Sequence, residues 1–156
     1  MLNYDISSCC KILRFSRNMV ENSEKIEAET HQDYLLKLLR LEIEHREAAR
    51  RERLIKGAKF HAIKTFESFN FDDVILPSDV TKDYLKECRF LEEKKNLVFY
   101  GNISAGKTHL ATALGLEACR KGKSVKFFRT AALVNKLSEA KAEKNLSGLM
   151  KCQFSH

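Results

Sequence analysis

Eight consecutive residues of this sequence have the types and spacing needed to hold a polyphosphate. They are Gly101, Asn102, Ile103, Ser104, Ala105, Gly106, Lys107 and Thr108, and they fit the pattern G-x-x-x-x-G-K-[ST]. In such a loop the backbone N–H groups converge on the phosphates, and the following helix adds the positive end of its dipole. The lysine supplies a point charge beside the β- and γ-phosphates, and the last hydroxyl binds Mg²⁺. The pattern predicts binding of ATP with Mg²⁺, with Thr108 as the metal ligand.

Glycines and their replacements decide how well this loop can form. Gly101 and Gly106 allow a tight turn and a close approach of backbone to phosphate. Ser104 and Ala105 stand where many such loops have glycine or threonine. If the backbone at position 104 requires a positive φ, serine there costs about 1 kcal/mol of strain.

The segments around the loop alternate between two patterns. Residues 96–100 and 124–129 are apolar runs typical of buried strands, and residues 107–121 and 131–144 are rich in helix formers. This strand-helix-strand-helix order predicts an α/β fold with a parallel sheet.

The N-terminal part of the sequence predicts helices. Residues 22–59 are rich in good helix formers and predict one long helix or two, ending near Gly57. Residues 65–77 hold three phenylalanines and predict a linker packed by its own aromatic side chains. A short amphipathic helix is expected from Ser78 or Thr81 to about Glu93.

Positive charge is concentrated in one window. The chain has a formal net charge of +7, and residues 45–64 hold seven Lys or Arg against two Glu, a local excess of 7 − 2 = +5. Such an excess predicts an anionic partner, most commonly nucleic acid. The alternative is an exposed helix face partly neutralised by glutamates. The candidate DNA-binding residues are Arg46, Arg50, Arg51, Arg53, Lys56 and Lys59.

Composition argues against a membrane-spanning, a secreted or a zinc-binding protein. No apolar run approaches the roughly 18 residues that a membrane span requires, and residues 1–18 lack the apolar stretch of a secretory signal, so a cytoplasmic protein is expected. The five cysteines show no C-x-x-C spacing, which favours reduced thiols over a zinc site.

The run NLVFYGNISAGKTHLATALGLEACRKGKSVKFFRTAALVNKLSEAK resembles the ATPase core of the IstB-like proteins. These are AAA+ ATPases related to the DnaC helicase loader, and they assist the transposases of insertion sequences. The resemblance covers about residues 22–150. It implies an oligomer of the full-length protein that binds ATP and double-stranded DNA and assists a transposase.

The resemblance also implies parts that the sequence does not contain. The chain ends 156 − 108 = 48 residues after Thr108, and the Walker B acid, sensor and arginine finger of the family lie farther along. We therefore expect a truncated chain with no catalytic residue assigned and an incomplete AAA+ parallel-sheet core. The expected division is a helical basic region at 1–64, a linker and short helix at 65–95, and half of an ATPase domain at 96–156.

Other functions fit the same motif. A DnaC-like helicase loader uses a similar core, and a remnant that binds nucleotide or DNA without turnover fits the missing parts. A small metabolite kinase fits less well, because the sequence has no arginine-rich lid after the second apolar run.

Overall fold

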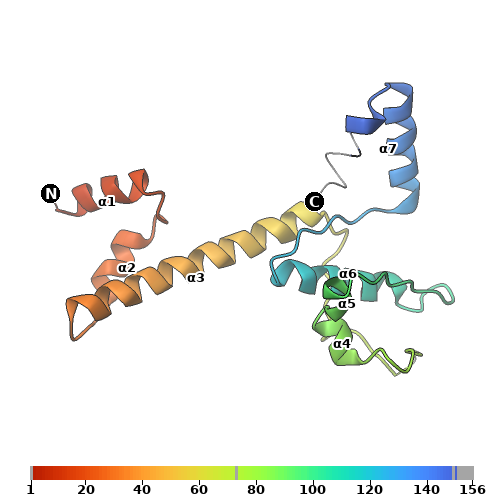
Figure 1. Ribbon diagram of the computed structural model, residues 1–156, viewed down its shortest axis with the longest axis horizontal. Coiled ribbons are helices and arrows are strands. Elements are labelled where there is room, and N and C mark those ends of the chain that lie inside the picture. The colour runs from red at the N-terminus through yellow and green to blue at the C-terminus, as the bar shows by residue number, and fades with distance from the viewer. Residues whose placement is uncertain (1, 73, 149, 151–156) are drawn as a thin grey trace. The chain divides into compact units, whose positions relative to one another are not determined.

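The computed structural model describes residues 2–72, 74–148 and 150, and the chain divides into two compact units, Met1–Glu52 and Arg53–His156. Helices account for the regular structure of the described residues (Figure 1). Their bounds are α1 Leu2–Ile12, α2 Met19–Lys25, α3 His31–Ala58, α4 Lys82–Lys86, α5 Arg89–Glu92, α6 Lys107–Arg120 and α7 Thr130–Ala142. Within the described residues, no helix has the length and apolar character needed to cross a membrane.

The first unit is built from α1, α2 and the first part of α3. Thr30 begins α3, because its side-chain Oγ1 accepts a hydrogen bond from the backbone N–H of Asp33 at 3.1 Å. The Tyr34 hydroxyl donates to the Ser23 carbonyl at 2.7 Å and so ties α3 to α2. The prediction of one or two helices over residues 22–59 is thus met by two helices with a break at residues 26–30.

A buried carboxylate stabilises the first unit. Glu42 of α3 is 3% exposed, and its two oxygens accept from the Ser16 backbone N–H at 3.0 and 3.2 Å. Arg46 donates to the same side chain at 2.7 Å. Burial alone would raise the pKa of Glu42, but the hydrogen bonds from Ser16 and Arg46 outweigh burial and lower this pKa. The ionised form therefore stabilises this unit.

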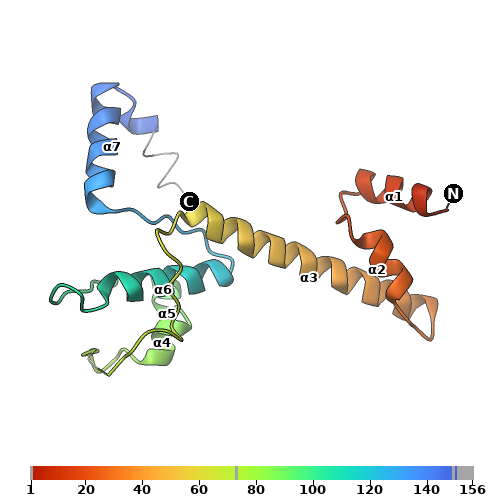
Figure 2. The ribbon, with the colours of Figure 1, turned by 180° about the vertical axis from the view of Figure 1, so that it is seen from behind.

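The second unit has its core between α4, α6 and the linker that precedes α4. Its buried side chains are Phe66, Phe71, Tyr84, Leu85, Leu110, Ala113 and Leu114. Thr81 is the cap of α4, accepting from the Tyr84 N–H at 3.0 Å. The single helix expected up to Glu93 is instead two short helices, because Cys88 takes a left-handed backbone with φ of 55° and separates α4 from α5. Both views show α4 and α5 beside α6 (Figures 1 and 2).

The predicted parallel-sheet core is wrong for the described residues. Segments 96–100 and 124–129 have no regular secondary structure and form no strand. Leu97 packs against the core while Val98 is 84% exposed, so the alternation of a strand is present in the side chains. A strand also needs a neighbouring chain for its backbone hydrogen bonds, and the Phe127 N–H donates instead to the Ala58 carbonyl at the end of α3, at 2.9 Å. Side-chain pattern alone therefore does not make a sheet here.

Candidate nucleotide-binding site

Three residues of the loop 101–106 have a positive φ, a backbone conformation that favours glycine. Gly101, Ser104 and Gly106 have φ values of 148°, 68° and 77°. The conditional expectation for Ser104 is therefore met: a serine occupies a left-handed position, which is strained for a residue with a Cβ. The strained residue lies between segment 96–100 and the first turn of α6.

Lys107 folds back over the loop. Its ammonium Nζ donates to the carbonyl oxygens of Gly101 and Asn102, at 2.9 and 2.6 Å. The backbone N–H of Ala105 also donates to the Asn102 carbonyl, at 3.3 Å. These bonds place the positive charge of the side chain at the mouth of the loop, where a phosphate would compete with the carbonyls for it.

The first backbone N–H groups of α6 receive no capping hydrogen bond from the side chain of the N-cap residue. Gly106 is the N-cap and makes no side-chain capping bond, and no acidic residue lies in the first turn. The first N–H groups of a helix have no acceptor within the helix. Together with Lys107, this donor set fits an anion such as a phosphate group. Thr108 lies in this turn and is exposed, and its hydroxyl would be the group that holds Mg²⁺.

The linker contacts the start of α6, a relationship that sequence reasoning missed. A Cβ on Gly106 would lie 2.8 Å from Cε2 of Phe69, so that ring occupies the space beside the glycine. The ring also packs edge-on against His109, with centroids 5.1 Å apart. The three phenylalanines predict a self-packed linker, and Phe69 does contact Phe71 with ring centroids 4.8 Å apart. No spacing in the sequence indicates that one ring also reaches the loop.

His109 binds the linker by hydrogen bonds. Its Nε2 lies 2.9 Å from the Thr65 carbonyl and 3.3 Å from the Ser68 hydroxyl. A carbonyl only accepts, so Nε2 carries the proton that it donates to Thr65. The imidazole thus fixes the first turn of α6 to residues 65–68.

Comparison with known proteins identifies the family. The family model described as IstB-like ATP binding protein matches residues 12–153. The chain belongs to this family.

Relatives of the family come from insertion sequences of several bacteria. The chain is 34% identical over 116 residues to an insertion-sequence ATP-binding protein of Mycobacterium tuberculosis, covering 74% of this chain and 46% of that one. It is 35% identical over 120 residues to the IS232 ATP-binding protein of Bacillus thuringiensis subsp. berliner, covering 75% and 47%. The IS5376 ATP-binding protein of Geobacillus stearothermophilus is 32% identical over 126 residues, covering 78% and 50%. The chain thus spans about half the length of these relatives.

The candidate DNA-binding residues of this family member lie on α3 and one residue beyond it, and all are exposed. Arg46 already donates to Glu42 and, at 2.7 Å, to the Arg14 carbonyl, and its guanidinium lies over the Phe15 ring. Arg51 lies 3.6 Å from Glu47 in an exposed ion pair. Arg46 therefore has a structural role in the first unit, whatever else it binds.

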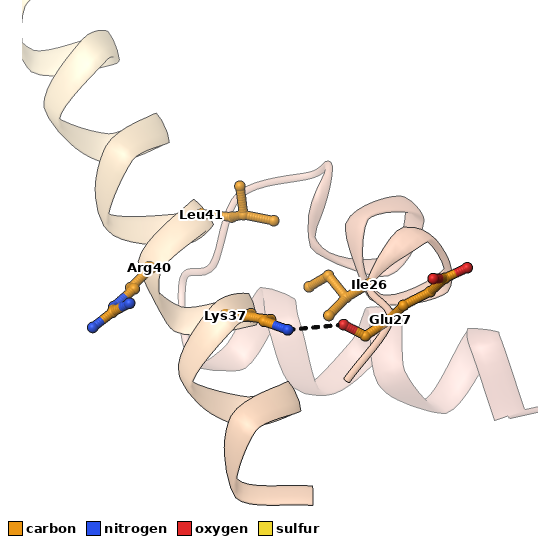
Figure 3. Close-up of a pocket in the computed structure, with 5 residues that line it drawn as sticks. All are labelled: Ile26, Glu27, Lys37, Arg40 and Leu41. Carbon is orange, nitrogen blue, oxygen red and sulfur yellow. Dashed lines mark hydrogen bonds between the residues drawn. The ribbon is translucent and has the colours of Figure 1, made fainter. Parts of the chain in front are cut away.

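A shallow groove of about 350 Å³ lies on the first unit (Figure 3). Ile26 and Leu41 form its apolar floor, and the Lys37 ammonium donates to the Glu27 carbonyl at 3.0 Å on its rim. Lys37 is also paired with Asp33 at 2.7 Å. Arg40 also lines the groove, so a second cationic side chain lies beside Lys37.

Two thiols of the second unit are buried. Cys88 and Cys119 are at most 2% exposed, and burial raises the pKa of each. Cys9 and Cys10 are also free thiols, while Cys152 lies outside the described residues. Within the part of the chain that the structure describes, no group of three His, Cys, Asp or Glu could hold a metal.

Proposed function

We propose that this chain binds ATP with Mg²⁺ at residues 101–108, as part of an insertion-sequence helper protein of the bacterial cytoplasm. Binding is proposed without a hydrolysis step. The observation that carries the proposal is the loop itself: left-handed turns at Ser104 and Gly106 lead into an uncapped helix start, with the Lys107 ammonium at its mouth. Bound Mg²⁺ would neutralise phosphate charge, and Thr108 would hold it.

The family supports the identity of the ligand. The relatives from Mycobacterium tuberculosis and Bacillus thuringiensis are both named as ATP-binding proteins. Their insertion-sequence origin favours a transposition helper over a helicase loader.

Calorimetric titration of the chain with ATP and Mg²⁺ tests this proposal. Lys107→Ala should weaken binding by about 10- to 150-fold, because a hydrogen bond to a charged group contributes about 1.5–3 kcal/mol. Lys136→Ala removes an exposed lysine of α7 and is the matched control. Equal affinities for wild type and Lys107→Ala would refute a phosphate role for the loop.

Double-stranded DNA and a transposase are the proposed partners. The local excess of positive charge on the C-terminal half of α3 supports DNA contact. The candidates for phosphate contacts are exposed Arg and Lys residues: Arg46, Arg50, Arg51, Arg53, Lys56 and Lys59.

Binding to a DNA duplex at several salt concentrations tests this second part. Changing Arg50, Arg51 and Arg53 to Gln should weaken binding and make the salt dependence shallower, by up to about 0.9 per lost phosphate contact in log–log slope. The control variant changes three other lysines to Gln and so removes the same positive charge away from α3. These lysines are Lys136 and Lys141 of α7 and Lys144 just after it. If both triple variants lose the same affinity and slope, the effect is one of net charge and the α3 surface is not the DNA site.

A further inference from the structure

We propose that Phe69 and His109 position the phosphate loop, so that the linker residues 65–71 set the affinity of the site. This inference rests on the proposed function for its ligand. It concerns a contact that neither the motif nor the family comparison assigns: the ring of Phe69 against Gly106, and the imidazole of His109 on the linker.

The first step is the position of the ring. Gly106 is the N-cap of α6 and has φ of 77°, so its backbone directs the first N–H groups of the helix. Phe69 Cε2, Cζ and Cδ2 lie 2.8, 3.5 and 3.8 Å from where a Cβ of that glycine would stand. The face of Gly106 is therefore covered by an aromatic ring, which limits how far this residue can turn.

The second step is what holds the ring. Phe69 packs edge-on against Phe71, and Phe71 stacks on Phe66 with ring centroids 6.0 Å apart. Phe66 and Phe71 are 6% and 9% exposed and belong to the same core as Leu110 of α6. Movement of the ring away from Gly106 would thus disturb a buried cluster.

The third step is the hydrogen bond from the helix to the linker. His109 Nε2 donates to the Thr65 carbonyl, and the Ser68 hydroxyl donates to the same carbonyl at 3.2 Å. The first turn of α6 is therefore tied to the linker at two points, the ring of Phe69 and the carbonyl of Thr65. Loss of either contact should let the loop adopt backbone conformations in which its N–H groups no longer converge on a bound phosphate.

These residues are positioning residues, and their contacts are with the protein. Phe69→Leu keeps an apolar side chain but loses the ring, and an aromatic contact of this kind contributes about 0.5–1.5 kcal/mol. We expect affinity for ATP with Mg²⁺ to fall roughly 2- to 12-fold. Phe69→Tyr keeps the ring and should restore affinity. His109→Ala should act in the same direction, and His109→Gln, which retains an N–H donor, should recover part of the loss.

The structure offers a matched control. Phe60 packs on Gly115 of the same helix, with Cε1 2.8 Å from where a Cβ would stand, but nine residues beyond Gly106. Phe60→Leu makes the same chemical change on the same helix away from the loop. It should lower stability while leaving affinity unchanged.

Inorganic triphosphate with Mg²⁺ distinguishes positioning from direct contact. A misplaced phosphate loop should bind inorganic triphosphate and ATP less tightly by the same factor. If Phe69→Leu weakens ATP alone, the ring touches the nucleoside and the positioning role is refuted. If Phe60→Leu and Phe69→Leu weaken binding equally, the effect is one of general stability and the proposal also fails.

Hydrogen exchange without any ligand separates this inference from the proposed function. The backbone N–H groups of residues 103–108 should exchange faster in Phe69→Leu than in wild type or Phe60→Leu. If wild type binds neither ATP nor triphosphate, the proposed function is refuted, and faster exchange confined to Phe69→Leu still supports positioning of the loop. Unchanged exchange in that variant overturns the inference.

Discussion

The Nζ atom of Lys107 lies 2.6 Å from the carbonyl oxygen of Asn102. A second bond at 2.9 Å joins it to the Gly101 carbonyl, so one side chain closes the loop on itself. This lysine therefore stabilises the turn, and in the proposed function it would also offer its charge to phosphate.

The first prediction follows from that closure. Lys107→Ala should lower the free energy of unfolding by about 1 kcal/mol in the absence of nucleotide, because two hydrogen bonds to loop carbonyls are lost. Urea denaturation followed by circular dichroism measures the change. Lys136→Ala should have no comparable effect, and identical stabilities of the two variants would contradict the closure.

The second prediction concerns the strained serine. Ser104 has φ of 68°, and Ser104→Gly should raise the free energy of unfolding by about 1 kcal/mol by removing the Cβ from a left-handed backbone. Ser104→Ala keeps the Cβ and should bring no gain. Tighter binding of ATP by the glycine variant is expected as well, measured by the same titration. A destabilised glycine variant would be inconsistent with strain at this position.

The third prediction uses the carboxylate of Glu42. Its pKa is lowered in the folded state, so its stabilising effect is fully present above the ordinary value of 4.5 and is lost as pH falls through the folded-state pKa. Glu42→Gln should destabilise the first unit by about 1–3 kcal/mol at neutral pH, because hydrogen bonds to a buried charge are lost.

Denaturation of wild type and Glu42→Gln from pH 7 down to pH 3 checks the sign. The stability difference between them should shrink as the pH drops below 4.5. Glu47→Gln is the control, since Glu47 is an exposed partner in an ion pair. If the stability difference between wild type and Glu42→Gln stays constant over this pH range, the charge of Glu42 does not contribute to the stability of the first unit.

The fourth prediction concerns thiol reactivity. Burial raises the pKa of Cys88 and Cys119, so both should react with a thiol reagent more slowly than the exposed Cys9. Mass spectrometry of the labelled chain resolves the order of reaction. In urea the difference should disappear, and early labelling of Cys119 in the folded chain would contradict its burial.

Some of the helices were predictable from local pattern. Helix α6 begins at Lys107 and ends at Arg120, close to the predicted 107–121, because Gly106 and Gly122 stand on either side of a run rich in helix formers. The sequence also raised the possibility of a positive φ at Ser104, because many such loops have glycine or threonine at that position, and the structure has φ of 68° there.

The rest depends on contacts that are distant in sequence. The apolar run 96–100 predicted a strand that the structure does not have, because whether such a segment pairs depends on which chain lies beside it, and no local pattern specifies that. The break at Cys88 places a non-glycine residue at φ of 55°, which propensity does not indicate. The contact of Phe69 with Gly106 joins residues 37 positions apart (106 − 69), beyond the reach of any spacing rule.

Two phenylalanine–glycine contacts hold α6, Phe69 on Gly106 at its start and Phe60 on Gly115 in its middle. Each ring fills the space that a methyl group on its glycine would need, so the two members of a pair share one volume. The two pairs then differ in what a substitution costs. An alanine at Gly115 would need the Phe60 ring to shift or become smaller, whereas an alanine at Gly106 would also be strained by the left-handed backbone, whatever the size of Phe69.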